Sequence, residues 1–370
     1  MILKSITLKN FRNYRSETLT FHERFNVIAG DNAQGKTNLL EAINLLCTFR
    51  PFKQVKMEEL ILFGEEEGRV KGEIELESGL NEVHIVLRKG GKTLKLNGKV
   101  IYNTTKFTGK FNIITFLPSD LEIIKGAIQD RRKYIDTVIC NIIPEHLRDL
   151  KLYFRALTQR NALLTHQTQV SKESIEVWNE TIAEIGGRIT RRRIKFIKKI
   201  EPEIKEAYRQ ISGLETDIQI QYKTSFTPSV SFEEDIKREL ELRFSHDRKY
   251  GHTSVGPHRD QIDFAIDGKI ASVFASQGEA KTLVLALKTS EIKLLTQILK
   301  RTPILILDDI TSELDYRRRS FLFHLLREFN GQIFITTTAP KEILYKGEKK
   351  VFFIEGGKVQ PTVLRYSPVY

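Results

Sequence analysis

Residues 30–37 read GDNAQGKT, which matches the pattern G-x-x-x-x-G-K-[ST] at every fixed position. Glycines let the backbone curl so that successive N–H groups point at phosphate oxygens. Lys36 is long enough to reach the β- and γ-phosphates of a nucleotide, and the Thr37 hydroxyl can bind Mg²⁺. The alternative is a glycine-punctuated turn without a ligand. The residues predicted to bind a nucleotide here are Gly30, Asp31, Asn32, Ala33, Gln34, Gly35, Lys36 and Thr37.

Apolar segments on both sides favour the phosphate-binding loop over the plain turn. RFNVIA (24–29) is typical of a short buried strand, and NLLEAINLLCTF (38–49) has the spacing of a buried helix. A strand before the loop and a helix after it form the context that such a loop requires. The helix would also direct its positive N-terminal end at the same anion. We therefore expect ATP and Mg²⁺ as cofactors.

A second segment supplies the acids that a nucleotide-bound metal needs. PILILDDI (303–310) is a nearly continuous apolar run, typical of a parallel strand covered on both faces, and it ends in Asp308 and Asp309. We expect Asp308 to hold Mg²⁺ together with Thr37, and Asp309 to act on the attacking water as general base or to position it. The alternative is a polar strand end. The long separation of Lys36 from Asp308 favours an ATPase with a large insertion over a small GTPase.

A third segment, SQGE (276–279), opens the next predicted helix. Ser276 can cap this helix while Glu279 reaches back to it, which is a capping box. The functional interpretation adds that the helix N-terminus can receive a γ-phosphate. The residues predicted to bind the nucleotide here are Ser276, Gln277, Gly278 and Glu279.

The composition restricts the class of protein. The chain has 370 residues, with 59 Lys and Arg against 47 Asp and Glu, which gives a net charge of +12. Such a surplus suits a polyanion such as nucleic acid or an anionic membrane, the alternative being a soluble protein that is basic without a polyanionic partner. The two cysteines exclude a disulfide scaffold and a CxxC zinc site. Without a signal-peptide core or an apolar run of roughly 18 residues, we expect a cytoplasmic protein with no membrane partner.

Two predicted helices between residues 144 and 210 carry apolar residues on heptad spacing and indicate an antiparallel helical arm. The simplest architecture is an α/β core built from both chain ends, with this arm inserted. The predicted seam of the first helix is Leu147, Leu150, Phe154, Leu157 and Leu164, and that of the second is Ile175, Trp178, Ile182, Ile185, Ile189 and Phe196.

The order of the motifs (phosphate loop, SxGE, DD and SELD) resembles the ABC-type ATPase heads of the SMC/Rad50 group, and within it the RecF family. The resemblance implies an α/β fold: an ABC-type P-loop ATPase head with an inserted mostly helical arm domain. It implies head segments at 1–135 and 251–370, an arm at 136–250, and Arg12 and Asn13 as further nucleotide-binding residues. The matching segments are LKNFRNY (8–14), GDNAQGKTNLLEAI (30–43), FLPSDL (116–121), DRRKYID (130–136), GPHRD (256–260), SQGEAKTL (276–283), LILDDITSELD (305–315) and ITTT (335–338).

Several positions depart from transporter-type ABC proteins. SQGE stands where LSGGQ would be, and the catalytic acid is Asp309 where transporters have Glu. No histidine follows the last core strand, so it is open whether Thr336, Thr337 or Thr338 senses the γ-phosphate. It is likewise open whether Asp120 replaces a missing loop glutamine. These departures predict slow hydrolysis, which suits a timing switch better than a motor.

A local concentration of charge predicts where DNA binds. RITRRRIKFIKK (188–199) contains seven cations and no acid. A solvated helix face is the alternative. Contacts of Lys and Arg with phosphates give affinity without sequence preference, and no base-reading motif is present. The predicted DNA-binding residues are Arg188, Arg191, Arg192, Arg193, Lys195, Lys198 and Lys199.

The resemblance also implies a function: ATP-dependent DNA binding in recombinational repair and replication restart. It implies an ATP-dependent homodimer that clamps DNA at single-strand gaps or single-strand/double-strand junctions and helps load a recombinase. A weak, DNA-stimulated hydrolysis of ATP to ADP and phosphate would release the clamp. The implied protein partners are RecR and RecO. The alternatives are the ATPase subunit of an ABC transporter and a DNA-end-processing ABC-type ATPase, which would need a cluster of acidic metal ligands.

Overall fold

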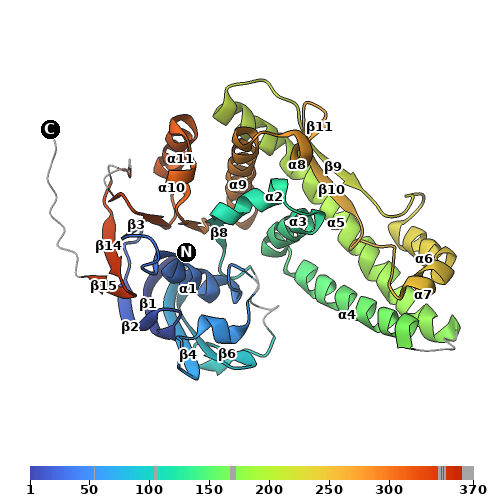
Figure 1. Ribbon diagram of the computed structural model, residues 1–370, viewed down its shortest axis with the longest axis horizontal. Coiled ribbons are helices and arrows are strands. Elements are labelled where there is room, and N and C mark those ends of the chain that lie inside the picture. Colours follow the sequence, from blue (N-terminus) through green and yellow to red (C-terminus); the bar gives the residue numbers. More distant parts are fainter. Residues whose placement is uncertain are drawn as a thin grey trace. The chain divides into compact units, whose positions relative to one another are not determined.

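The computed structural model describes residues 1–360 apart from 54, 104–106, 108, 167–171, 341, 342, 344 and 346. The chain divides into two compact units (Figure 1), which we call the head (1–120 and 291–370) and the arm (121–290). This division places residues 121–135 and 251–290 in the arm, whereas the sequence-based boundaries place them in the head. The domain boundaries predicted from the sequence, at 135/136 and 250/251, stay a prediction.

The first sheet of the head is antiparallel. Alternate residues of its strands are buried, as expected of a sheet with one face on the core. Its strands, in spatial order, are β2 (Tyr14–Thr20), β1 (Ile2–Phe11), β4 (Glu67–Leu76), β5 (Gly79–Arg88), β6 (Gly91–Leu96) and β7 (Lys99–Val100).

The second sheet of the head is parallel except for one edge strand, as the apolar runs around 24–29 and 303–307 predicted. Its two central strands and their neighbour are buried throughout. The strands, in spatial order, are β15 (Lys358–Gln360), β14 (Lys350–Glu355), β3 (Phe25–Ala29), β13 (Ile333–Thr337), β12 (Ile304–Leu307) and β8 (Ile113–Phe116).

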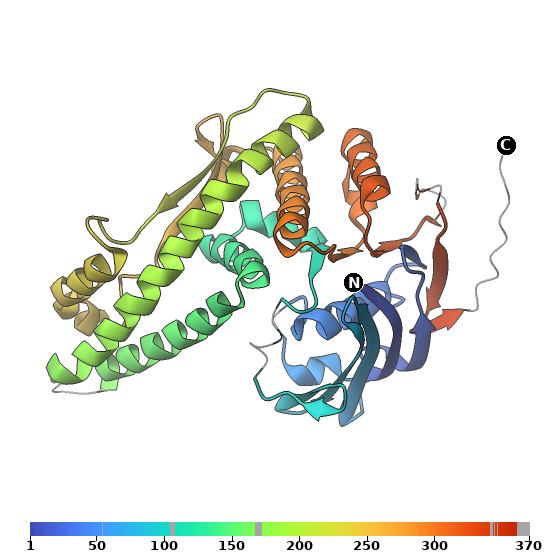
Figure 2. The same cartoon turned by 180° about the vertical axis from the view of Figure 1, so that it is seen from behind.

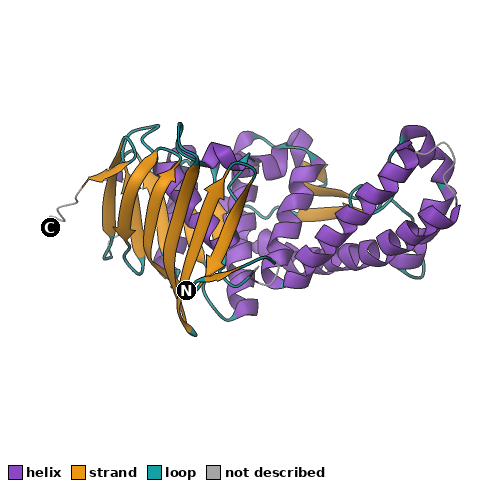
Figure 3. Cartoon of the chain, turned by 90° about the horizontal axis from the view of Figure 1, so that it is seen from below, coloured by secondary structure: helices purple, strands orange, loops and turns teal. Residues whose placement is uncertain are grey.

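Helix α1 (Lys36–Thr48) follows β3 and shares one hydrophobic core with both sheets, whose strands are orange in Figure 3. In a parallel sheet the carboxyl ends of neighbouring strands meet at one edge. The loop after β3, the end of β13 and the end of β12 therefore lie together. This order of strands positions the candidate site.

The arm contains the two long helices predicted from the sequence, α4 (Pro144–His166) and α5 (Lys172–Ser212), which run antiparallel and side by side (Figure 2). Helix α6 (Phe232–Leu242) packs against α5. A three-stranded sheet of β9 (Ile218–Lys223), β10 (Gln261–Ile266) and β11 (Lys269–Ile270) completes the arm with the shorter helices α2 (Glu122–Lys125), α3 (Ile128–Ile142), α7 (Phe244–Tyr250) and α8 (Ala271–Phe274).

The predicted seam of α4 is wrong at Phe154. Phe154 is 50% exposed, whereas its neighbour Tyr153 is 1% exposed and belongs to the hydrophobic core of the arm. The inner face continues from Leu150 to Tyr153, whose hydroxyl bonds to His258 Nδ1 at 2.7 Å. The same face carries Arg160, which is fully buried and paired with Asp247 at 2.8 Å. The sequence of α4 alone contains neither partner.

Candidate nucleotide-binding site

The loop between β3 and α1 requires its two fixed glycines. Gly30 has φ 149° and Gly35 has φ 114°, a backbone region that side chains other than glycine rarely adopt. A Cβ atom at Gly30 would collide with the backbone carbonyl of Ile354, and one at Gly35 would collide with the side-chain amide of Asn13. The spacing of the glycines is thus a steric requirement of the curled loop.

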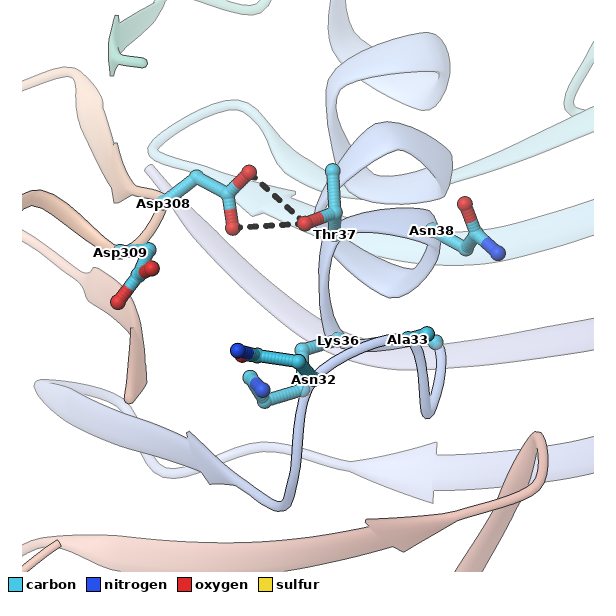
Figure 4. A pocket seen from close by; sticks show the side chains of 8 residues that line it. Asn32, Ala33, Lys36, Thr37, Asn38, Asp308 and Asp309 are labelled. Atoms are coloured by element: carbon cyan, nitrogen blue, oxygen red, sulfur yellow. Dashed lines mark hydrogen bonds between the residues drawn. The ribbon is translucent and has the colours of Figure 1, made fainter. Parts of the chain in front are cut away.

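This loop encloses a pocket of about 160 Å³ (Figure 4). The pocket receives side chains from the loop, from the first turn of α1 and from the end of β12. Its lining residues are Asn32, Ala33, Gly35, Lys36, Thr37, Asn38, Asp308 and Asp309. The structure therefore brings together the first two motifs predicted from the sequence.

Lys36 lies within the curl of the loop, with 7% of its surface exposed. Its Nζ donates to the carbonyls of Gly30 and Asp31, both at 2.7 Å. Burial lowers the pKa of this ammonium, and the carboxylates of Asp309, Asp308 and Asp31 act in the opposite direction. An ammonium held in this position can contact the phosphates of a nucleotide bound in the loop.

Asp308 faces Thr37 across the pocket. The Thr37 hydroxyl lies 2.9 and 3.0 Å from the two carboxylate oxygens, and the Thr336 hydroxyl donates to Oδ1 at 2.8 Å. Burial raises the pKa of Asp308, while the hydrogen bonds from Thr336 and Thr37 oppose the rise. A buried carboxylate beside a hydroxyl fits Mg²⁺, which takes oxygen ligands and is usually held by one or two protein groups plus substrate phosphates.

Asp309 follows the strand in a left-handed backbone conformation, with φ 48°. Its amide donates to Thr336 Oγ1 at 2.8 Å, which fixes the turn. Aspartate adopts this conformation more readily than most residues, although it is uncommon outside glycine. The turn places the Asp309 side chain on the pocket next to Asp308 (Figure 4).

Arg12 and Asn13 lie in the turn between β1 and β2, where they support the phosphate loop. Asn13 Nδ2 donates to the carbonyl of Gln34 at 2.9 Å, and Arg12 Nε donates to Glu41 of α1 at 2.8 Å. Sequence reasoning missed Tyr14, whose buried hydroxyl donates to the carbonyl of Gly35 at 2.9 Å. Contact of Arg12 and Asn13 with the nucleotide itself stays a prediction.

Two further contacts hold the loop from the turn between β14 and β15. The amide of Gly356 donates to Gln34 Oε1 at 2.7 Å, and the amide of Gly357 donates to the Gln34 carbonyl at 3.0 Å. Both glycines have positive φ. In the sequence, the consecutive glycines at 356 and 357 are the signal that could have identified this turn.

The structure shows the surroundings of the threonines at 336–338 and of Asp120, whose roles the sequence left open. Thr336 and Thr337 are buried, and Thr338 is exposed. The Thr336 hydroxyl donates to Asp308 and accepts from the amide of Asp309. Asp120 Oδ2 accepts from the amide of Leu117 at 2.7 Å, which closes the turn after β8. The sensing of a γ-phosphate by the threonines, and the replacement of a glutamine by Asp120, stay open.

The capping box at the start of α9 (Gln277–Leu299) is present. The amide of Ser276 donates to Glu279 Oε2 at 2.8 Å, and the amide of Glu279 donates to Ser276 Oγ at 3.2 Å. The first of these contacts is the main reason why the pKa of Glu279 is lowered. Ser276, Gln277 and Glu279 are exposed. Binding of a γ-phosphate by this segment stays a prediction.

The arginines of the predicted DNA-binding run are held by carboxylates of the arm itself. Arg193 is 2% exposed, pairs with Asp136 at 2.7 Å and donates to the Pro257 carbonyl at 2.6 Å. Arg188 and Arg192 both reach Asp149, and Arg191 pairs with Glu233. A buried arginine in this position cannot contact a phosphate from solution.

The lysines of the same run differ from the arginines. Lys195, Lys198 and Lys199 are exposed on α5. In the part of the chain that the structure describes, none of the three makes an ion pair. They are therefore the members of the run with charge available to a polyanion.

Two observations concern other classes of protein. Within the described ranges, no group of three or more His, Cys, Asp or Glu residues has the arrangement of a metal site. Among the same residues, no helix is long and apolar enough to cross a membrane.

Comparison with known proteins gives concordant matches. A family model described as "RecF/RecN/SMC N terminal domain" matches residues 2–357. Two relatives called "DNA replication and repair protein RecF" are similar over nearly the whole chain. The one from Geotalea uraniireducens (strain Rf4) is 36% identical, covering 97% of this chain and 100% of the relative. The one from Streptococcus suis (strain 05ZYH33) is 38% identical, covering 97% and 99%.

Solved structures agree with these matches. One described as the "recombination mediator protein RecF-ATP in RecFOR pathway" superposes with a TM-score of 0.90 at 34% identity, covering 98% of each chain. An Smc head domain from Pyrococcus furiosus superposes with a TM-score of 0.58 at 15% identity, covering 97% of this chain and 95% of that one, and shows the fold alone. The α/β fold class predicted from the sequence, an ABC-type ATPase head, is confirmed.

Proposed function

Because the chain belongs to the RecF family, we propose that it is an ATP-dependent DNA-binding protein of recombinational repair and replication restart. The observation that carries this proposal is the pairing of Thr37 with Asp308 beside Lys36 in one pocket. These groups are the hydroxyl, carboxylate and ammonium that binding of a metal-bound nucleotide requires.

In the proposed reaction, the curled loop binds the phosphates of ATP through its backbone N–H groups, and Lys36 neutralises their charge. Thr37 and Asp308 would hold Mg²⁺, which neutralises charge on the phosphates when it is bound. Asp309, one residue further on, orients the attacking water or accepts its proton. Its side chain is one methylene shorter than that of glutamate, which supports slow hydrolysis.

We propose that ATP closes two copies of the chain into a clamp. One chain carries both the phosphate loop and Ser276 with its helix start, so a two-fold arrangement lets each copy cover the nucleotide of the other. Such an interface is self-complementary and gives a closed dimer. The γ-phosphate would complete charge-assisted contacts across it, and hydrolysis would remove them.

The proposed DNA target is a single-strand gap or a junction between single-stranded and duplex DNA. Lys195, Lys198 and Lys199 would contact phosphates without sequence preference. We expect DNA to stimulate the weak ATPase, and RecR and RecO to act with the clamp in loading a recombinase. Because the substrate would be chromosomal DNA of a bacterium, we place the activity in the cytoplasm.

The mass of the protein in solution tests this proposal. Light scattering with Mg²⁺ should give a dimer with ATP and a monomer with ADP or without nucleotide. ATP hydrolysis should be slow and should rise when duplex DNA is added, in buffer without detergent. A protein that stays monomeric with ATP, both with and without DNA, would refute the clamp.

A further inference from the structure

The outer face of the first sheet of the head carries a concentration of cations that no part of the proposed mechanism uses. In β1, β4 and β5 the buried residues alternate with residues directed away from the core. The outward positions at the centre of this sheet are occupied by basic side chains. We call them the basic face: Lys9, Arg69, Lys71, His84 and Lys95.

The strand register places these residues in two adjacent rows that cross the sheet. In one row Lys9 stands opposite Arg69. In the next row Lys71 stands opposite His84, and His84 opposite Lys95. Like charges on directly opposite residues of an antiparallel pair are destabilising. Lys9 and Arg69 form such a pair, whereas the lowered pKa of His84 leaves this side chain uncharged at neutral pH between Lys71 and Lys95.

Neither row contains an acid. Their other members are Ser16, Val86 and Thr93 in the first row and Thr18, Thr7 and Val100 in the second. Acids stand in the rows on either side, where Glu73 is opposite Glu82 and Glu67 is opposite Arg88. A face that serves only solubility is expected to mix both signs. Here the two central rows contain no acid, although acids border them on both sides.

Neighbouring acids compensate only part of the charge. Arg69 pairs with Glu67 at 2.6 Å, and Lys71 pairs with Glu82 at 2.7 Å. Lys9, His84 and Lys95 make no ion pair with any residue that the structure describes. Burial lowers the pKa of His84, and the charges of Lys95, Arg69 and Lys71 lower it further, although Glu82 opposes them. The surroundings of His84 thus have a surplus of positive charge.

We propose that the basic face binds the phosphate backbone of duplex DNA, as a contact surface of the head in addition to the lysines of α5. This inference rests on the proposed function, because it assumes that the protein binds DNA. The rows offer cations and hydroxyl groups, which are the usual partners of phosphate oxygens. They contain no Phe, Tyr or Trp, whereas surfaces that hold single strands commonly stack bases on aromatic side chains. Charge complementarity and the missing stacking groups together favour duplex DNA as the occupant.

A double variant tests the face without disturbing an ion pair. Lys9→Gln with Lys95→Gln should weaken binding to labelled duplex DNA by on the order of tenfold near physiological salt, measured by fluorescence anisotropy with ATP and Mg²⁺. The slope of log affinity against log salt should become shallower by about 1.8, which is the value for two lost phosphate contacts. All duplex sequences should be affected alike, and single-stranded DNA no more than duplex.

The matched control removes the same charge elsewhere on the head. Lys53→Gln with Lys300→Gln replaces two exposed lysines of the head outside the basic face, and it should leave both affinity and salt slope close to those of the wild type. The opposite change adds a cation to the second row. Thr18→Lys should tighten binding and steepen the salt slope. Melting temperatures of all variants show whether each is folded.

The outcomes separate this inference from the proposed function. If the wild type binds DNA and the Lys9/Lys95 variant binds it with the same affinity and slope, the basic face is not a DNA surface and the inference is wrong. A larger loss for single-stranded than for duplex DNA would also overturn the inference. If the wild type itself does not bind DNA with ATP, the proposed function fails.

Discussion

Asp308 connects three parts of the chain that lie far apart in the sequence. Its carboxylate accepts from Thr37, 271 positions away, and from Thr336, and its amide donates to the carbonyl of Phe116 at 2.9 Å. Thr37 lies in the first turn of α1, Thr336 near the end of β13 and Phe116 at the end of β8. The side chain of Asp308 thus ties the phosphate loop to the end of β13, and its replacement should affect more than the metal.

Lys36→Ala should abolish tight binding of ATP. Apart from Lys36, the residues that line the pocket include no Lys or Arg, so nothing else in the lining can neutralise the phosphates in this position. Equilibrium dialysis with labelled ATP measures the effect. An affinity equal to that of the wild type would show that the nucleotide is held elsewhere.

Asp309→Asn should keep ATP bound and stop its turnover, because asparagine preserves the shape of the side chain but cannot accept a proton. Asp308→Asn should weaken Mg²⁺ binding as well, since the hydroxyls of Thr37 and Thr336 would then face an amide. Single-turnover hydrolysis and a Mg²⁺ titration distinguish the two variants. Normal hydrolysis by both would refute the assignment of the acidic pair.

The arm is held together by charged side chains that bridge its helices. Arg193 of α5 pairs with Asp136 of α3, and Arg192 of α5 pairs with Asp149 of α4. Although burial alone would raise it, the charge and hydrogen bonds of Arg193 hold the pKa of Asp136 at about 2. The basic run of α5 is therefore in part a structural feature of the arm.

Arg193→Met should lower the free energy of unfolding by about 3–5 kcal/mol, because it removes the cation that pairs with Asp136 and leaves this buried carboxylate only its bond to His146. Arg191→Met is the matched control, since its pair with Glu233 is half exposed and should contribute no more than about 1 kcal/mol. Urea unfolding of the full chain measures both. Equal effects of the two variants would contradict the bridging role of Arg193.

His258 should make the folded protein sensitive to mild acid. Burial lowers its pKa from 6.5 to about 4, and its Nδ1 lies 2.7 Å from the Tyr153 hydroxyl. The unfolded state then binds the proton more readily, so this stabilisation is complete above pH 6.5 and is lost as the pH falls toward 4. The loss should reach about 3 kcal/mol.

Urea unfolding at a series of pH values between 7 and 4 measures this dependence. His258→Asn removes the titrating group and should flatten the curve in that window, whatever it does to the stability at pH 7. A variant with the same pH dependence as the wild type would assign the acid sensitivity to other groups.

Local backbone chemistry explains which features the sequence predicted well. The glycines of the phosphate loop, the capping box at Ser276 and the strand before Asp308 each depend on neighbours within a few positions. The seam at Phe154 and the role of Arg193 were misjudged because Tyr153 and Arg193 have their partners, His258 and Asp136, far away in the sequence. Tyr14 was missed for the same reason, since its partner Gly35 lies in another segment.

The position of the insertion explains the architecture of the head. Residues 1–120 supply the phosphate loop and residues 291–370 supply Asp308 and Thr336, so one site needs both ends of the chain. Helix α9 is continuous from the arm segment at Gln277 into the head segment at Leu299. The start of this helix belongs to the arm, whereas the residues that line the nucleotide pocket all belong to the head.

Ser276→Arg should abolish the ATP-dependent dimer while leaving ATP binding to the monomer nearly intact. The bulky side chain would occupy the space that the proposed clamp assigns to the partner's γ-phosphate, whereas Ser276 itself is exposed in the single chain. Light scattering with ATP and Mg²⁺ gives the mass, and dialysis gives the nucleotide affinity. A variant that still dimerises would refute this role of Ser276.

The split head has a consequence for synthesis on the ribosome. The antiparallel sheet is complete once Val100 has emerged, whereas β3 has no sheet partner until β13 and β14 follow near the end of the chain. The hydrogen bond from the Leu3 amide to Gln332 spans 329 positions. At about 5–20 residues per second, β3 stays without a sheet partner for roughly 15 to 65 s. During this time the nascent chain presents an unpaired strand, and we expect it to be the stage at which the protein most needs a chaperone.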